Sequence, residues 1–297
     1  MKEIEIPADV PKHAEQKYKE NYEAITKGTG NLFIFAADQK IEHLNKDFYG
    51  PDIPAEVNNP KHLFEIATKG TIGAFATHLG LISQYGKKYP TINYIVKLNA
   101  KTNIIPASEK DPISNRLWTV QDVVEFQKNS NLPIRGVAYT IYLGSSFENR
   151  MLQKAAQVIY NAHKEGLVTI LWMYPRGKNV NNEKNPDMIA GAAGVATSLG
   201  ANFAKINPTA QITELQQATS AAGNTKLICS GGPKIDEETF LQNLHNQIHI
   251  GKTSGCAIGR NIFQRKLENA IAFTKAISAI VYEEKSVEKA IKLWEKK

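Results

Sequence analysis

Lys205 has the residue type and the setting of a nucleophile for carbonyl chemistry. It lies near the end of a run of small and apolar residues, Gly200–Ile206. Burial among apolar side chains disfavours the charged ammonium and lowers the pKa of a lysine. The neutral amine can then attack a carbonyl carbon and form a Schiff base. The run by itself fits equally well with a lysine that pairs with a carboxylate in the protein interior.

A tyrosine and an aspartate in comparable settings could move protons beside such an amine. Tyr174 stands in the segment 172–178, where Pro175 makes the turn rigid. A nearby lysine cation would lower the pKa of this tyrosine and suit it to general acid–base catalysis. Packing of its ring, with a hydrogen bond to a carbonyl, is the alternative. Asp38 follows the apolar segment 31–37 and could assist the amine, or it could cap a turn.

Two glycine-containing segments near the C-terminus are typical of phosphate binding. The segment 230–234 (SGGPK) follows one apolar run, and the segment 259–261 (GRN) follows the next. Glycines let backbone N–H groups approach an anion, a helix beginning after Gly259 would add its dipole, and an arginine can hold phosphate with two N–H groups. The predicted phosphate-binding residues are therefore Ser230, Gly231, Gly232, Gly259 and Arg260.

A second lysine, Lys97, also ends an apolar run. Its neighbours Asn99 and Lys101 are polar, so it could remain charged or bind hydroxyl and phosphate groups. Lys205 has the drier setting and lies one predicted strand after Tyr174. We therefore expect Lys205 to be the nucleophile, and we expect a charged Lys97 to lower the pKa of Lys205 further by repulsion.

Eight short β-rich runs alternate with amphipathic helical patterns along the chain. The predicted strands are 31–37, 72–77, 93–98, 134–141, 168–172, 201–206, 226–229 and 255–258, and the predicted helices are 62–69, 119–128, 146–163, 186–199, 212–222, 236–246 and 261–282. Asn185 before Pro186, and Asp236, are typical helix N-caps. This alternation predicts an α/β fold, a single (β/α)8 TIM barrel, with a doubly wound open sheet as the alternative.

A barrel of this kind would bring the candidate residues together, because its active site forms at the C-terminal ends of the strands. The pattern predicts one domain over residues 1–297, with a barrel core at about 31–282 and an extra amphipathic helix at 285–297. The segment 101–117 reads as a long loop over one barrel face. A helix within 79–88 is only weakly indicated.

Charge and hydropathy exclude several classes of protein. The chain carries 36 Lys and Arg against 29 Asp and Glu, a net charge of +7, but the lysines alternate with acidic residues and form no long basic run. This favours a solvated surface and an anionic small substrate over nucleic acid. No apolar run is long enough to span a membrane, and residues 1–5 do not resemble a signal peptide. We expect a cytoplasmic protein.

The cysteines and histidines do not form a recognisable metal site. Cys229 and Cys256 are too few for a disulfide framework or a cysteine-built zinc site, and we expect buried thiols. The seven histidines are scattered along the chain. His245 and His249 have helical spacing but fall on a helix predicted to lie on the back of the barrel. The sequence therefore predicts no metal and no other cofactor.

Several motifs occur together in an order that is typical of one family. They are AD (37–38) with IEH (41–43), KLNAKT (97–102), YTIYLGS (139–145), YPRG (174–177), GA and K (200–205), SGGPK (230–234) and GRNIFQR (259–265). In this combination the chain resembles the archaeal-type class I fructose-1,6-bisphosphate aldolases, Schiff-base aldolases of the DeoC/FbaB-like family, from about Leu32 to Ile280. The resemblance implies an enzyme of glycolysis or gluconeogenesis that needs no metal and forms a large homo-oligomer, such as a decamer.

The resemblance also implies roles for individual residues. Lys205 would form the Schiff base, Tyr174 would act as general acid and base, and Asp38 would assist at the substrate carbons. The substrate-binding residues would be Trp172, Arg176, Lys97 and the predicted phosphate-binding residues. The implied reaction is the reversible cleavage of fructose 1,6-bisphosphate to dihydroxyacetone phosphate and glyceraldehyde 3-phosphate.

Two other functions fit part of this pattern. A 2-amino-3,7-dideoxy-D-threo-hept-6-ulosonate synthase-type transaldolase of aromatic biosynthesis shares the lysine, the tyrosine and the phosphate segments, although KLNAKT and YTIYLGS favour the bisphosphate aldolase. A non-catalytic sugar-phosphate-binding barrel would bind without a covalent adduct. The chain also departs from the family at Gln39-Lys40, where His-Gly is usual, and at Asn207-Pro208-Thr209, where Tyr-Thr-Gly is common.

Overall fold

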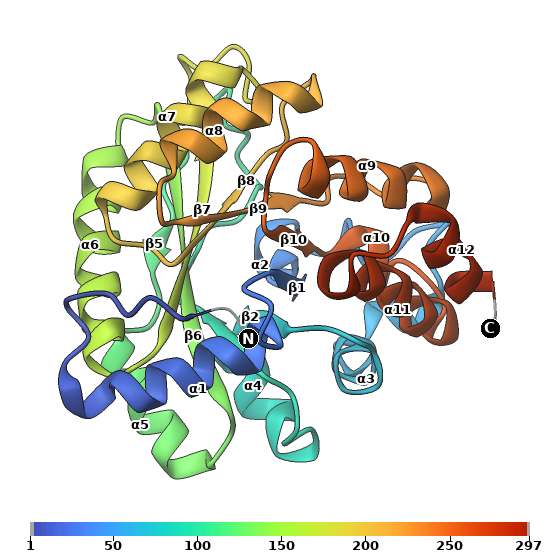
Figure 1. Ribbon diagram of the computed structural model, residues 1–297, viewed down its shortest axis with the longest axis horizontal. Coiled ribbons are helices and arrows are strands. Elements are labelled where there is room, and N and C mark those ends of the chain that lie inside the picture. The colour runs from blue at the N-terminus through green and yellow to red at the C-terminus, as the bar shows by residue number, and fades with distance from the viewer. Residues whose placement is uncertain (1–2, 296–297) are drawn as a thin grey trace.

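The computed structural model describes residues 3–295, and its eight parallel strands form a closed barrel (Figure 1). The strands follow the order β1-β10-β9-β8-β7-β6-β3-β2 around the ring. They are β1 (Leu32–Ala36), β2 (Ala74–His78), β3 (Tyr94–Lys97), β6 (Ile134–Leu143), β7 (Val168–Pro175), β8 (Phe203–Ile206), β9 (Lys226–Ser230) and β10 (Gly255–Ile258). The TIM-barrel prediction is confirmed, and a closed ring leaves no place for the open sheet.

Helices surround the barrel and connect consecutive strands (Figure 1). They are α1 (Glu15–Thr26), α2 (Gln39–Glu42), α3 (Lys61–Lys69), α4 (Leu79–Tyr85), α5 (Val120–Ser130), α6 (Glu148–Lys164), α7 (Pro186–Ser198), α8 (Leu215–Ala221), α9 (Glu237–His249), α10 (Arg260–Phe263), α11 (Leu267–Glu283) and α12 (Val287–Glu295). Short 3-10 turns cover Lys12–Ala14, Ala55–Asn58, Gly86–Lys88 and Ile212–Glu214. In the long loop after β3, β4 (Asn99–Ala100) pairs with β5 (Asn115–Arg116).

The strands bury both faces, as parallel barrel strands do. Along β1, Phe33 and Phe35 pack with the outer helices, whereas Leu32, Ile34 and Ala36 face the barrel interior. The same alternation places Phe203 of β8 inside and Ala204 outside. Because side chains repeat every two residues along a strand, Lys205 faces inward at the C-terminal end of β8.

The expected helix signals hold where the side chain can reach a free backbone N–H group. Asn185 accepts a hydrogen bond from the backbone of Met188 at the start of α7, and Asp236 accepts one from Thr239 at the start of α9. Helix α4 forms in the weakly indicated segment 79–88. The C-terminal helix also forms, as α12; residues 296–297 of its predicted range lie outside the described residues. The extent of a single domain stays a prediction.

Three elements differ from the sequence-based expectation. The long helix expected over 261–282 is split: α10 ends at Phe263, and α11 starts after Lys266, whose extended backbone (ψ 146°) does not continue a helix. Strand β7 continues to Pro175, so Tyr174 lies within the strand rather than after it. No sequence pattern predicted α1, which closes the N-terminal end of the barrel. Its Tyr18 and Ile25 pack with the strand side chains that face the barrel interior. In residues 3–295 no helix is long and apolar enough to cross a membrane.

Candidate active site

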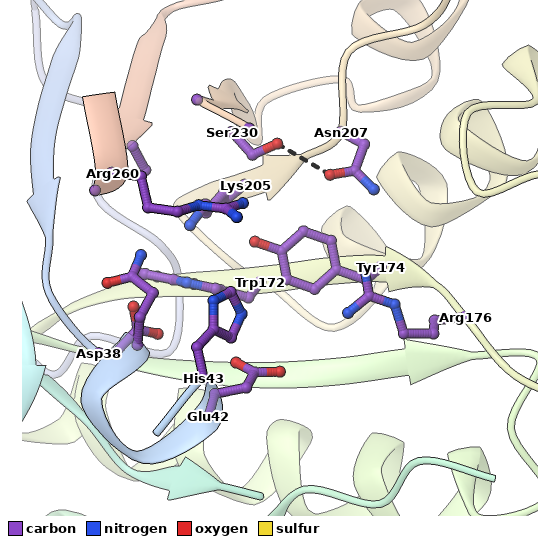
Figure 2. A pocket seen from close by; sticks show the side chains of 15 residues that line it. Asp38, Glu42, His43, Trp172, Tyr174, Arg176, Lys205, Asn207, Ser230 and Arg260 are labelled. Atoms are coloured by element: carbon purple, nitrogen blue, oxygen red, sulfur yellow. Dashed lines mark hydrogen bonds between the residues drawn. The ribbon is translucent and has the colours of Figure 1, made fainter. Parts of the chain in front are cut away.

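A cavity opens at the C-terminal ends of the strands, and the predicted site residues converge on it (Figure 2). Its lining residues are Asp38, Gln39, Glu42, His43, Trp172, Tyr174, Arg176, Lys205, Asn207, Ser230, Gly231, Gly232, Ala257, Gly259 and Arg260. Every predicted site residue except Lys97 is among them. The barrel thus gathers side chains that are more than 200 residues apart in the sequence, such as Asp38 and Arg260.

Lys205 occupies the buried position that a Schiff-base nucleophile requires. Its residue is 5% exposed, and its Nζ lies 5.0 Å from the ring centroid of Trp172 and 6.0 Å from that of Tyr174. Burial lowers the pKa of Lys205, while the carboxylates of Asp38 and Glu42 oppose this effect. A smaller lowering contribution comes from the cation of Arg260.

Lys97 lies apart from the cavity lining. Its Nζ donates hydrogen bonds to the backbone oxygen and to Oδ1 of Asn99, both at 2.7 Å. Burial lowers the pKa of Lys97 to about 8; Asp38 and Glu42 oppose this lowering, and Lys205 adds to it. The two lysines therefore lie close enough for their cations to repel each other, as the sequence led us to expect. Two of its three N–H donors are turned to Asn99, and the substrate contact of Lys97 stays a prediction.

The protonation of Tyr174 also differs from the sequence-based expectation. We expected a neighbouring lysine cation to lower the pKa of this phenol, but burial, Asp38 and Glu42 together raise the pKa well above its usual value. Arg176 opposes the shift without reversing it. Tyr174 is therefore a neutral proton donor in the resting site. Asp38 supplies negative charge here and makes no side-chain cap on α2, which excludes the turn-capping alternative.

The predicted phosphate end of the cavity is formed by the segments after β9 and β10. Ser230 Oγ donates to Asn207 Oδ1 at 2.9 Å (Figure 2). A Cβ atom on Gly259 would come within 2.4 Å of Gln39 Nε2 and 2.7 Å of the Ala36 oxygen, so only glycine fits there. Because α10 has four residues, a long-helix dipole does not contribute as expected.

Arg260 and Arg176 are both held by carboxylates, in different ways. Arg260 Nε lies 3.6 Å from Asp47 Oδ2, and Asp47 also contacts His43 Nδ1. Arg176 donates from Nε and from Nη2 to the two carboxylate oxygens of Glu183, each at 2.6 Å. Both guanidinium groups can still offer N–H donors to an anion in the cavity, since each carries five.

Five lining residues were not assigned to the site from the sequence: Gln39, Glu42, His43, Asn207 and Ala257. Glu42 accepts a hydrogen bond from the hydroxyl of Tyr142, which fixes a carboxylate at the cavity wall. The signal that could have found three of them was the segment 39–43 directly after the strand-end Asp38. The candidate residues were sought at strand ends, whereas Gln39, Glu42 and His43 belong to α2 and its C-terminal end.

A metal centre is not apparent at this cavity or elsewhere in residues 3–295, where no group of three or more His, Cys, Asp and Glu side chains could hold an ion. Cys229 and Cys256 are buried free thiols. His245 and His249 stack at 4.1 Å on α9, away from the cavity lining.

Known proteins that are similar to this chain in sequence and in structure are named as fructose-bisphosphate aldolases. A relative from Methanocaldococcus jannaschii, named fructose-bisphosphate aldolase/6-deoxy-5-ketofructose 1-phosphate synthase, is 49% identical over 296 residues, or 99% of this chain and 95% of the relative. The solved fructose-bisphosphate aldolase from Slackia heliotrinireducens is 46% identical with a TM-score of 0.97, covering 99% of this chain and 94% of that chain.

A more distant solved structure contains a covalent intermediate of its substrate. It is an archaeal fructose-1,6-bisphosphate aldolase with its catalytic Lys covalently bound to the carbinolamine intermediate of the substrate; it is 31% identical with a TM-score of 0.78, over 89% of this chain and 99% of that chain. Residues 32–265 match the family described as DeoC/LacD family aldolase, and this stretch includes every residue that lines the cavity. The chain belongs to the DeoC/LacD family of aldolases.

Proposed function

We propose that this chain is a class I, Schiff-base aldolase that reversibly cleaves fructose 1,6-bisphosphate to dihydroxyacetone phosphate and glyceraldehyde 3-phosphate. The observation that carries the proposal is the buried Lys205, which lines a cavity together with Tyr174 and with the glycines and Arg260 of the predicted phosphate end. The relatives named above are fructose-bisphosphate aldolases at 31% identity or more. They favour this function over a heptulosonate-type transaldolase and over a non-catalytic barrel.

The first step is the attack of the Lys205 amine on the ketone carbon C2. Because burial lowers the pKa of Lys205, the neutral amine forms more readily than on an exposed lysine. The resulting carbinolamine must lose its hydroxyl group as water. Tyr174 is protonated in the resting site, so it can donate the proton that this step consumes. The products are a cationic iminium on Lys205, water and a tyrosinate.

The second step uses the charge that the first one created. The iminium cation stabilises the nearby tyrosinate, which accepts the proton of the C4 hydroxyl as the C3–C4 bond breaks. The aldehyde leaves, and the bonding electrons move into the enamine on Lys205. Tyr174 then returns its proton to C3, and water hydrolyses the iminium to release the ketose phosphate half. The carboxylate of Asp38 is placed to stabilise the cationic intermediates.

The phosphate end fixes where C2 comes to lie. Backbone N–H groups of Gly231, Gly232 and Gly259, with Ser230 and Arg260, would hold the phosphate next to C1. Binding energy from this remote group then positions the ketone against Lys205. The aldehyde half extends past Tyr174 toward Arg176, which would meet the second phosphate of the bisphosphate.

A second reaction is favoured by one observation. The M. jannaschii relative is also named a 6-deoxy-5-ketofructose 1-phosphate synthase, a name that describes a product with one phosphate. In this chain Glu183 occupies the Nε–Nη2 edge of Arg176. At the other end, Arg260 and the glycines beside it line the cavity. We infer that the enamine also accepts aldehydes that lack a phosphate, giving ketose 1-phosphates.

The direct test of the proposed function is a coupled assay for triose phosphate release from fructose 1,6-bisphosphate by the purified chain. We expect turnover that survives exhaustive treatment with a chelator. Loss of activity that zinc restores would contradict the Schiff-base mechanism, and sugar-phosphate binding without turnover would favour the non-catalytic barrel. A cytoplasmic location and a symmetric homo-oligomer, such as a decamer, belong to the same proposal; light scattering of the purified protein gives the oligomer mass.

A further inference from the structure

The cavity has an arginine at each of two sides, and the two differ in their surroundings. Figure 2 shows Arg260 and Arg176 on different sides of the Tyr174 ring. Arg260 belongs to the loop after β10, beside the glycines of the phosphate end. Arg176 follows β7 and stacks over the ring of Tyr174, with its guanidinium carbon 5.5 Å from the ring centroid. A ligand that reaches from one side to the other spans the reacting lysine and tyrosine.

The carboxylate partners of the two arginines are held at different distances. Arg260 lies 3.6 Å from Asp47, whose carboxylate also contacts the imidazole of His43 and is thereby shared. Arg176 forms two hydrogen bonds of 2.6 Å to Glu183. Glu183 itself does not line the cavity. The charge of Arg176 is therefore compensated more fully than that of Arg260.

The geometry of the Arg176–Glu183 pair leaves one part of the guanidinium for a ligand. Nε and one Nη2 hydrogen point to Glu183, so the edge formed by Nη1 and Nη2 remains. A phosphate that binds this edge stays within one guanidinium width of the Glu183 carboxylate. Like charges at that separation repel, and the partly buried setting reduces the screening by solvent. The side chains of Arg176 and Glu183 are 29% and 36% exposed.

We propose that Glu183 is a specificity-determining residue that weakens the selection for a phosphate on the aldehyde half of the substrate. The pair keeps Arg176 oriented over Tyr174 but reduces its net attraction for a dianion. Substrates with and without the second phosphate are therefore accepted at the same site. This inference rests on the proposed aldolase function and deepens it.

The test compares fructose 1,6-bisphosphate with fructose 1-phosphate, which differ only in the second phosphate. The variant Glu183→Gln keeps the shape and one hydrogen-bond acceptor while it removes the negative charge. We expect the ratio of kcat/KM for bisphosphate over monophosphate to rise about tenfold through a lower KM for the bisphosphate, because a charge near the edge of a binding site acts mainly on the binding of charged ligands. The kcat/KM for the monophosphate should stay within about twofold of the wild-type value.

Two further variants tie the effect to the pair. Glu283→Gln removes an equal charge from an ion pair with Lys285 at 2.6 Å, near the opposite end of the barrel, and should leave the ratio unchanged. In an Arg176→Gln background, Glu183→Gln should produce no further rise, since the two residues act as one unit. Circular dichroism of each variant checks that the barrel is folded.

The outcomes separate this inference from the proposed function. A wild-type protein that cleaves neither ketose contradicts the aldolase function and, with it, this role of Glu183. An active Glu183→Gln enzyme whose ratio is unchanged contradicts the specificity role alone. A ratio that falls shows that Glu183 only orients Arg176 toward the phosphate, which also overturns the inference.

Discussion

Lys205 and Trp172 lie directly opposite each other on the neighbouring strands β8 and β7, with Lys205 Nζ 5.0 Å from the indole ring centroid. Lys97 Nζ lies 6.0 Å from the centroid of the same ring. The indole thus stands near both ammonium groups, and only Lys205 also lines the cavity. Side chains two residues apart on a strand point to the same face, so Tyr174 lies on the same face of β7 as Trp172. This register sets the nucleophile and its proton donor side by side.

The first prediction distinguishes the two lysines. Borohydride added with dihydroxyacetone phosphate should inactivate the enzyme and leave one reduced adduct, on the peptide that contains Lys205. Lys205→Ala should abolish both labelling and turnover, because within residues 3–295 no other lysine lines the cavity. Lys97→Ala should lower turnover and still permit an adduct. Peptide mass spectrometry reads the site of labelling; a label on Lys97, or robust activity with no label, would refute the mechanism.

The second prediction concerns proton transfer by Tyr174. Tyr174→Phe keeps the ring but removes the proton donor, so kcat should fall by roughly 10²- to 10⁴-fold, the usual contribution of general acid–base catalysis. Exchange of a C3 hydrogen of dihydroxyacetone phosphate with deuterated water should fall in parallel, because the enamine loses its proton source. NMR measures this exchange. Wild-type exchange in the variant would mean that another group, such as Asp38, protonates the enamine.

The third prediction concerns the phosphate end. Arg260→Ala should weaken binding of the bisphosphate by roughly 2–4 kcal/mol, since truncation of a charge-assisted contact usually costs that much. Steady-state kinetics should show this loss chiefly in KM, with the fold retained. Arg260→Lys serves as the matched control, because it keeps the charge but not the paired N–H donors. An unchanged KM in Arg260→Ala would place the phosphate elsewhere.

The fourth prediction links Lys97 to stability. Burial lowers the pKa of Lys97 to about 8, below the value of 10.5 for an exposed lysine. Between these two pH values the unfolded chain binds more protons than the folded one, so this group makes the free energy of unfolding rise with pH. Lys97 changes the free energy of unfolding by about 3 kcal/mol in total. The stability gained with rising pH is complete above the pKa of Lys97 in the unfolded chain and is lost as the pH falls through its pKa in the folded chain.

Chemical denaturation of the wild type and of Lys97→Met, at several pH values from about 7 to about 10, tests this linkage. The free energy of unfolding of the wild type should rise relative to that of the variant across this range. Equal pH slopes for the two proteins would show that Lys97 keeps an ordinary pKa in the folded state.

Much of the fold could be predicted from local patterns in the sequence. Buried parallel strands leave short apolar runs, and caps such as Asn185 and Asp236 mark helix starts by hydrogen bonds within one turn. α1 has no comparable sequence signal, because it has no broad apolar face. It buries a few separate side chains, such as Tyr18 and Ile25, against strand residues of the barrel interior. The break between α10 and α11 depends on non-helical backbone at Gln264 and Lys266, two residue types that suit a helix.

Residue types and their places after apolar runs were enough to find the residues that could carry the chemistry, because a lysine, a tyrosine and two glycine segments at strand ends must meet at one end of a parallel barrel. The charges and partners of these residues depend on how the chain is folded. Desolvation and the carboxylates of Asp38 and Glu42 act through space, so the raised pKa of Tyr174 and the lowered pKa of Lys97 could not be read from neighbours in the chain. The same holds for Glu183, whose pairing with Arg176 depends on how the loop after β7 folds back.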